Sequence, residues 1–257
     1  MSSGLRNKKK NLRQYYRALY LAWGAQHWWP AETRFEVIVG AYLTQNTAWT
    51  NVELALANLR TANVLSAEGI RGVSLAELER LIRPSGYFRQ KANRLKTFVA
   101  FLDKTYSGSL DQLFARPTNQ LREELLGLKG VGPETADSIL LYAGNHPVFV
   151  VDAYTRRILD RHRILPAKTD YEEIRGLFEQ ALAPVADKQP ANVAGQLESA
   201  ILGAAHPPSA MSMAARTPLT QIYNEMHGLI VGVGKNHCRK TKAACEECPL
   251  RPYLPTP

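Results

Sequence analysis

Apolar residues recur at helical spacing along most of this chain, and this pattern constrains its fold more than any other feature. Positions i, i+3, i+4 and i+7 are apolar in residues 35–43, 95–102 and 174–182, as in amphipathic helices. Proline and glycine clusters separate such segments at intervals of about 10 to 20 residues, which suits a bundle of short helices. Residues 148–151 could form a strand, but the run is too short for periodicity to decide. We therefore expect an all-α fold.

Composition and charge narrow the class of protein. The chain has 257 residues, of which 45% are hydrophobic and 21% charged, a globular composition with enough chain for one large or two small domains. No apolar run approaches the roughly 20 residues that cross a bilayer, and residues 1–10 lack the apolar core of a secretion signal. We expect a cytoplasmic protein without a membrane partner, associated with the nucleoid if bacterial. The net charge of +9 favours nucleic acid as a partner, although a solvated surface can also be basic.

A glycine-rich turn makes residues 121–159 the most informative segment. A helical pattern ends near Leu126, Gly130, Val131 and Gly132 form a tight turn, and Pro133 suits the first position of the next helix. Backbone N–H groups at the start of such a helix point outward and can bind a phosphate. An ordinary helix–loop–helix corner would have the same pattern.

An acidic residue, Asp152, follows Gly132 by twenty residues and would begin a further helix as its N-cap. The turn followed by GNHPVFVVDAYTRRIL resembles the helix-hairpin-helix, Gly/Pro-rich, Asp superfamily of base-excision DNA glycosylases, to which endonuclease III belongs. The resemblance implies that the hairpin residues 130–132 hold the DNA backbone and that Asp152 is the catalytic acid. It also implies two helical lobes, a six-helix lobe with the hairpin in residues 36–146 and a second lobe in residues 1–35 and 147–257.

One position departs from endonuclease III in a way that bears on the chemistry. Where endonuclease III has a lysine that attacks the sugar and forms a Schiff base, this chain has Glu134. A carboxylate cannot form an imine with C1′, and Lys129 lies on the other side of the turn. We therefore expect a monofunctional glycosylase in which water is the nucleophile.

Three further segments, residues 28–30, 35–47 and 81–92, resemble the 3-methyladenine glycosylase branch of these proteins, as does Glu134-Thr-Ala-Asp137. The resemblance implies an alkylated purine as the damaged base. We expect a monomer that acts on double-stranded DNA. Two alternatives are a binder of lesions or abasic sites with little or no turnover, and a glycosylase for oxidised bases.

Aromatic residues sandwich the extruded base in those relatives, and position implies Trp28, Trp29 and Trp49 here. Methylation leaves a purine cationic, and an indole face favours a cation by about 0.5 to 2 kcal/mol. Alternatively, Trp28 and Trp29 close the core between the N-terminal segment and the helical bundle.

The resemblance also assigns two pairs of residues to the gap that the extruded base leaves in the duplex. Gln45 and Asn46 match an amide pair, which can donate and accept toward the orphaned base. They could instead cap the helix that begins near Phe35. Tyr87 and Phe88 would supply a second wedge, or belong to a simple helix connection.

The three cysteines, Cys238, Cys245 and Cys248, have the spacing C-x6-C-x2-C, which in a cytosolic chain indicates a metal site. Endonuclease III carries a 4Fe-4S cluster on C-x6-C-x2-C-x5-C, and Leu254 stands at the fourth position here. The resemblance implies a 4Fe-4S cluster whose fourth ligand is not a cysteine, with a labile cluster, no metal, or zinc as alternatives. The candidates for the fourth ligand are His237, Glu246, Glu247 and water.

Basic residues gather in four segments that we expect to face one duplex. They are an N-terminal arm from Arg6 to Arg13, a helix over residues 89–96, the pair Arg156 and Arg157, and a loop over residues 239–242. Residues 184–218 are rich in Ala, Pro, Ser and Gly and predict a loop-rich surface insertion, with a short helix near residues 197–202.

Overall fold

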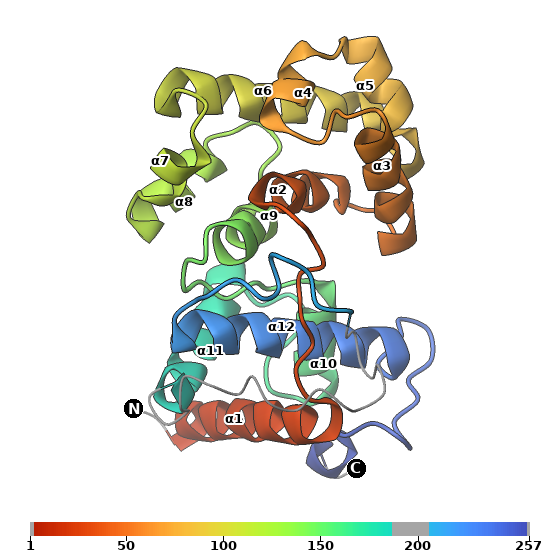
Figure 1. Ribbon diagram of the computed structural model, residues 1–257. Coiled ribbons are helices and arrows are strands. Elements are labelled where there is room, and N and C mark those ends of the chain that lie inside the picture. Colours follow the sequence, from red (N-terminus) through yellow and green to blue (C-terminus); the bar gives the residue numbers. More distant parts are fainter. Residues whose placement is uncertain (1–2, 187–205, 256–257) are drawn as a thin grey trace. The chain divides into compact units, whose positions relative to one another are not determined.

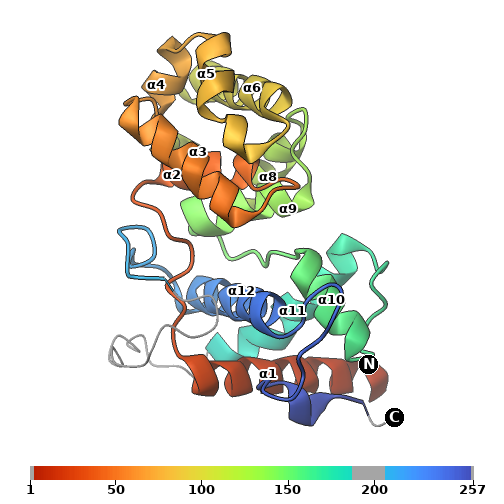
Figure 2. The same cartoon turned by 90° about the vertical axis from the view of Figure 1, so that its right-hand side faces the viewer.

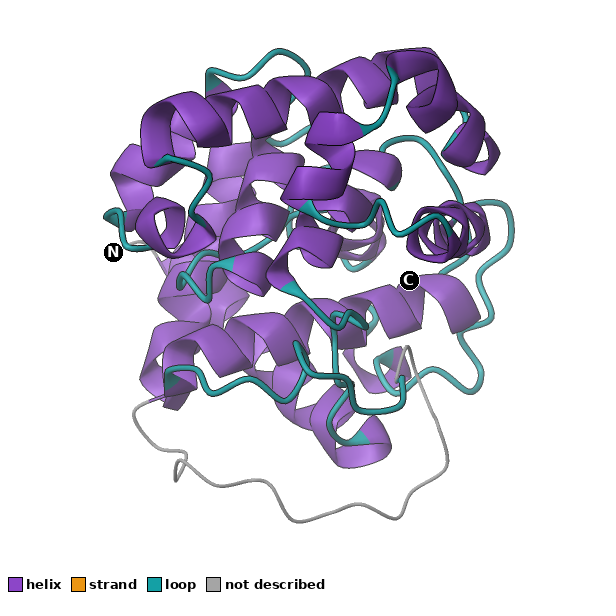
Figure 3. Ribbon diagram, turned by 45° about the horizontal axis from the view of Figure 1, so that its top comes forward, coloured by secondary structure: helices purple, strands orange, loops and turns teal. Residues whose placement is uncertain are grey.

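The computed structural model describes residues 3–186 and 206–255 and is helical (Figure 1). Within these residues the β-structure amounts to one isolated bridge between Cys238 and Ala243 (Figure 3). The expectation of an all-α fold is therefore confirmed. Residues 148–151 are buried and have no regular secondary structure, and they pair with no strand among the described residues. The helix expected near residues 197–202 lies outside the described residues.

The chain divides into two compact units, one formed by Met1–Pro30 with Pro147–Pro257 and the other by Ala31–His146. We call them the terminal unit and the hairpin unit. In neither unit is a described helix both long enough and apolar enough to cross a membrane.

The hairpin unit is built around a helix that is buried on every side. In α2 (Arg34–Leu43), every residue from Phe35 to Leu43 is buried. Thr33 begins this helix by accepting a hydrogen bond from the Glu36 amide. The other helices of this unit are α3 (Trp49–Thr61), α4 (Ala67–Gly72), α5 (Leu75–Leu81), α6 (Phe88–Tyr106), α7 (Leu110–Phe114), α8 (Thr118–Leu126) and α9 (Pro133–Ser138), of which α3, α6 and α9 contact α2. A 3₁₀ turn over Arg83–Ser85 precedes α6, and α9 continues as a π-helical turn over Ile139–Ala143.

A buried ion pair joins the two helices of the hairpin. Arg122 of α8 donates from Nε to Asp137 Oδ1 at 2.7 Å and from Nη2 to Asp137 Oδ2 at 3.1 Å. The Asp137 side chain is fully buried, and that of Arg122 is 13% exposed. Because removal of one partner would leave the other charge buried and unpaired, this pair fixes how α8 and α9 pack. Asp137, which the sequence singled out as part of a motif, thus lies inside the hairpin.

The terminal unit packs four helices together, α1 (Ser3–Trp23), α10 (Ala153–Arg161), α11 (Tyr171–Ala186) and α12 (Pro218–Asn236), followed by a 3₁₀ turn over Arg251–Tyr253 (Figure 2). Helix α12 contacts the other three, and α1 lies against α11. The basic segment from Arg6 to Arg13, expected as an arm, is instead the first half of α1. Leu12, Tyr15, Tyr16 and Leu19 are buried at helical spacing, so α1 has a packed apolar face beside its basic residues.

Glu225 of α12 ties the segment before Pro30 to the helices of the terminal unit. Its carboxylate accepts hydrogen bonds from the Gln26 amide and from Gln221 Nε2, both at 2.8 Å. Burial raises the pKa of Glu225 to about 7, although these hydrogen bonds and the charge of Arg216 act in the opposite direction. The side chain is therefore protonated at acidic pH and has to ionise inside the protein as the pH rises.

This burial makes stability depend on pH. Because the folded protein holds the Glu225 proton more tightly than the unfolded chain, the stabilisation is complete below the unfolded pKa and is lost as the pH rises through about 7. Glu225→Gln has no such proton to lose. We expect the unfolding free energy of the wild type, relative to Glu225→Gln, to fall by about 2 to 3 kcal/mol between pH 5 and pH 8, measured by urea denaturation. Exposed Glu173 gives a matched control, Glu173→Gln, and a Glu225→Gln difference that does not change with pH would refute the prediction.

Candidate functional site

Asp152 stands at the start of α10, and the helix orients its carboxylate. Its Oδ1 accepts hydrogen bonds from the Thr155 amide at 2.7 Å and from Thr155 Oγ1 at 2.8 Å. In return, the Asp152 amide donates to Thr155 Oγ1, which completes a capping box. The sequence-based prediction that this acid begins a helix is thus confirmed. Since Oδ1 alone accepts the capping hydrogen bonds, Oδ2 is available for other interactions.

The second oxygen of Asp152 faces a histidine that sequence reasoning missed. His227 Nε2 of α12 lies 3.6 Å from Asp152 Oδ2, and the two side chains are 5% and 12% exposed. Burial lowers the pKa of His227, with the charge of Asp152 acting in the opposite direction. The signal in the sequence was weak: within apolar α12, the polar residues Asn224, Glu225 and His227 interrupt the pattern at buried positions.

Of the two adjacent tryptophans, Trp28 packs against α12. Trp28 and Trp29 are 4% and 6% exposed, and their rings meet edge to face with centroids 5.5 Å apart. Lys235 Nζ lies 5.5 Å from the centroid of the Trp28 ring. A Cβ atom at Gly228 would come within 3.1 Å of Trp28 Cβ, so the missing side chain at this position lets Trp28 approach the helix closely. Asp152, His227 and these tryptophans all belong to the terminal unit.

The hairpin unit holds the remaining candidates, among them the turn before α9. Gly130 has a φ of 84°, and a Cβ there would meet Arg94 Nε at 2.1 Å, so this position requires glycine. Gly132 is the N-cap of α9, is exposed, and has open space where a Cβ would stand. Between them, Val131 is buried and anchors the turn. Glu134 and Lys129 are both exposed.

Gln45 joins the end of α2 to this turn. Its Nε2 donates to Gly130 O at 3.0 Å and to Thr135 Oγ1 at 2.9 Å. The alternative role of capping α2 is wrong for Gln45, because Thr44 is the C-cap and donates its hydroxyl to Gly40 O. Asn46 is exposed, with a left-handed φ of 53°.

A buried lysine links the Gln45–Thr47 loop to the turn before α6. Lys91 is 1% exposed, and its ammonium donates to Leu43 O at 2.8 Å, to Ser85 O at 2.7 Å and to Thr47 Oγ1 at 3.1 Å. Burial, with the charge of Arg94 as a smaller cause, lowers the pKa of Lys91 to about 8. The expectation that the basic segment 89–96 faces a duplex is therefore wrong for this lysine, which faces inward.

The aromatic candidates of the hairpin unit lie at helix starts. Tyr87 precedes α6 with a left-handed φ of 45° and is 67% exposed. Phe88 is half-buried, with the guanidinium groups of Arg83 and Arg89 5.8 and 5.5 Å from its ring centroid. Trp49 begins α3, and its Nε1 donates to Glu53 Oε1 at 2.9 Å.

The three cysteines follow α12, and their surroundings do not match a four-ligand cluster. Cys238 is buried, and its sulfur accepts a hydrogen bond from Arg161 Nη1 at 3.2 Å. Leu254, at the position of the fourth ligand, offers no donor atom. Among the described residues, no group of three or more His, Cys, Asp or Glu side chains is placed to hold a metal ion. The described donor set therefore does not fit a 4Fe-4S cluster.

Two of the candidate fourth ligands also have other contacts. The His237 ring stacks on Trp23 with centroids 5.8 Å apart, and Glu246 Oε2 lies 3.0 Å from Arg251 Nη1.

Arginines of α10 hold the loop that carries Cys238. Arg157 Nε donates to Cys238 O at 2.6 Å, and Arg161 donates to Arg239 O at 2.8 Å and to Lys240 O at 3.2 Å. Arg156 is also used internally, since its Nη1 donates to Ala167 O and Thr169 O. The pair Arg156 and Arg157, expected to face a duplex, thus holds the terminal unit together.

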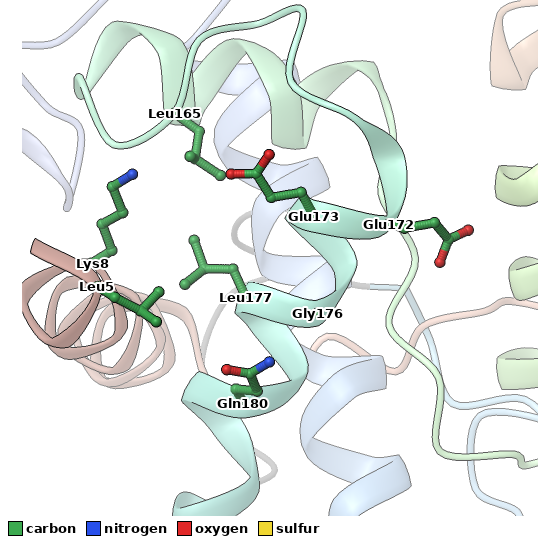
Figure 4. Close-up of a pocket in the computed structure, with 8 residues that line it drawn as sticks. All are labelled: Leu5, Lys8, Leu165, Glu172, Glu173, Gly176, Leu177 and Gln180. Carbon is green, nitrogen blue, oxygen red and sulfur yellow. The ribbon is translucent and has the colours of Figure 1, made fainter. Parts of the chain in front are cut away.

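One surface pocket lies between α1 and α11 and contains none of these candidates (Figure 4). Its volume is about 240 Å³, and it is lined by Leu5, Lys8, Leu165, Glu172, Glu173, Gly176, Leu177 and Gln180.

Comparison with known proteins identifies the family. Residues 39–184 match the model of the HhH-GPD superfamily of base excision DNA repair proteins. This chain belongs to that family. A putative DNA repair glycosylase of Methanocaldococcus jannaschii is 40% identical over 248 residues, which cover 96% of this chain and 97% of the relative. The suspected glycosylase family is thus confirmed.

Solved structures agree with this HhH-GPD membership. The 3-methyladenine DNA glycosylase MagIII of H. pylori, bound to 1,N6-ethenoadenine, superposes with a TM-score of 0.68 at 28% identity, covering 89% of this chain and 97% of MagIII. A trapped covalent endonuclease III–DNA intermediate has a TM-score of 0.67 at 20% identity, covering 94% of this chain and 93% of that one. The second likeness concerns the fold alone.

The hydrogen bonds of Lys91 should stabilise the hairpin unit. Lys91→Met would leave the carbonyl oxygens of Leu43 and Ser85 without this donor, and a buried acceptor without a partner costs about 1 to 3 kcal/mol. We expect the free energy of unfolding to fall by about 2 kcal/mol or more, measured by urea denaturation. Lys104 is exposed on the same helix, so Lys104→Met should change stability by less than about 0.5 kcal/mol. Equal effects of the two substitutions would contradict the prediction.

Proposed function

We propose that this protein is a monofunctional DNA glycosylase that removes an alkylated purine from double-stranded DNA. The geometry of Asp152 carries the proposal. Thr155 occupies Oδ1 twice, whereas Oδ2 takes no hydrogen bond from the described residues and lies beside His227. One carboxylate can therefore serve as helix cap and as catalytic group at the same time.

The chemistry requires one carboxylate and one water molecule. Extrusion of the damaged nucleotide costs a few kcal/mol of unstacking, and less where the lesion pairs poorly. The Asp152 carboxylate then stabilises the oxocarbenium-like sugar and orients or deprotonates the attacking water, as in glycoside hydrolysis. A purine that alkylation has made cationic is a good leaving group and needs no general acid. The product is an abasic site in an intact strand.

The hairpin unit would hold the DNA backbone. The exposed N-cap Gly132 begins α9 with open space above its Cα, which suits the close approach of a phosphate to backbone N–H groups. Gln45 already contacts the turn through Gly130. In the proposed complex, Gln45 and Asn46 enter the gap in the duplex, and exposed Tyr87 acts with Phe88 as the second wedge.

The base pocket would hold an alkylated purine. MagIII is a 3-methyladenine glycosylase solved with 1,N6-ethenoadenine, which favours an alkylated purine here. We assign Trp28 and Trp29 of the terminal unit to the pocket, and Trp49 of the hairpin unit remains a base-pocket candidate from the family resemblance alone. A cationic purine would replace Lys235 over Trp28 or stack on its other face.

We expect no strand cleavage because of Glu134. It occupies the place of the endonuclease III lysine, and its carboxylate cannot form an imine. Lys129 is exposed on the far side of the hairpin turn from α9.

Asp152→Asn tests the role of the carboxylate. Asparagine is as good an N-cap as aspartate, so α10 should remain folded while the charge is lost. We expect release of 3-methyladenine from methylated duplex DNA to slow at least about 100-fold, measured in single-turnover assays. The control is Asp160→Asn, which removes an exposed carboxylate farther along α10. Release by Asp152→Asn at the wild-type rate would remove Asp152 from the mechanism.

The same assay with a panel of lesions distinguishes the competing functions. Release of oxidised bases alone would replace the alkylpurine assignment. Tight binding to an abasic analogue without release of any base would indicate a protein that binds lesions without turnover.

Borohydride trapping tests the monofunctional assignment. Without a lysine nucleophile no Schiff base forms, so we expect no covalent protein–DNA adduct after reduction, measured by denaturing gel electrophoresis. Glu134→Lys supplies an amine at the endonuclease III position and should yield some adduct. An adduct with the wild-type chain would show that another lysine attacks the sugar.

A further inference from the structure

Helix α12, which packs against Trp28, carries a buried amide that has no hydrogen-bond partner in the described part of the chain. Asn224 is 1% exposed, and neither its Nδ2 nor its Oδ1 has a hydrogen-bond partner among the described residues. A buried amide without hydrogen bonds costs about 1 to 3 kcal/mol, and leucine would fill similar space without that cost. Such a residue at the centre of a packed helix calls for an explanation in function.

Its position on the helix points toward the reacting centre. Residues three and four positions apart share one face of a helix, so Asn224 shares a face with His227 and Gly228. His227 lies against Asp152, and Gly228 lies against Trp28. The face of α12 that carries Asn224 thus contacts both the proposed catalytic residue Asp152 and the proposed pocket residue Trp28.

We propose that Asn224 is a specificity-determining residue that hydrogen-bonds the Watson–Crick edge of the extruded base. This inference rests on the proposed glycosylase function. An amide offers one acceptor beside one donor, and extruded bases are read by hydrogen bonds to this edge. Both amide atoms are buried in the free protein. The entering base must therefore displace the side chains that cover Asn224 before it can form these hydrogen bonds.

The amide selects a chemical class of substrate. Adenine presents the N1 acceptor beside the N6 amino donor, which an asparagine side chain can match with two hydrogen bonds. Methylation at N3 leaves both atoms free, whereas the etheno bridge of 1,N6-ethenoadenine blocks both. Asn224 should therefore favour alkylated purines with an open Watson–Crick edge over those with a bridged edge.

The experiment compares two lesions in the same duplex and measures single-turnover release by the full-length protein. With Asn224→Leu, we expect release of 3-methyladenine to slow about 10- to 100-fold, because one or two hydrogen bonds are lost. Release of 1,N6-ethenoadenine should change less than about threefold, since the bridged base never used the amide. Asn236→Leu, at an exposed position of the same helix, is the matched control and should leave both rates unchanged.

Urea denaturation separates a recognition role from a structural one. If Asn224 serves recognition, Asn224→Leu should unfold at the same or higher urea concentration than the wild type. If release of both lesions slows equally, or if Asn224→Leu is less stable than the wild type, Asn224 has a structural role. The inference about Asn224 would then be wrong, while the proposed glycosylase function would be unaffected. If the wild type releases neither lesion, the proposed function fails and the inference fails with it.

Discussion

The hydrogen bonds between Asp152 and Thr155 are the interaction on which the candidate site depends. They use one carboxylate oxygen to begin α10 and thereby set the direction of the other. A free aspartate would sample several rotamers, and each would point the charge elsewhere. Here helix formation itself orders the side chain, so the capping and catalytic roles that competed for this residue in the sequence are compatible. His227 adds a second constraint from α12.

Local signals in the sequence predicted much of the fold. Pro133 begins α9 and Asp152 caps α10, as their preferences for helix starts indicate. Helix α1 was missed because its charges drew attention to an arm, although Leu12 and Leu19 already had helical spacing. The charged residues of such a helix lie on its exposed face, whereas its apolar residues determine which face is buried.

The candidate site was less predictable, because its contacts join residues far apart in the chain. Lys91 in a basic segment looks like any surface lysine, and its burial depends on carbonyl groups at Leu43 and Ser85. The proximity of His227 to Asp152 depends in the same way on how α12 packs against α10. Family resemblance could propose roles for residues, but it could not identify the neighbours that orient them.

The attachment of the Cys238 loop has a consequence for sequence variation. Arg157 and Arg161 hold it largely through backbone carbonyl groups of residues 238–240. A carbonyl acceptor is present whatever the side chain, so positions 239 and 240 can mutate without loss of the anchor. Substitutions at these two positions can therefore change the surface chemistry of the loop, while Arg157 and Arg161 on the neighbouring helix keep its backbone in place.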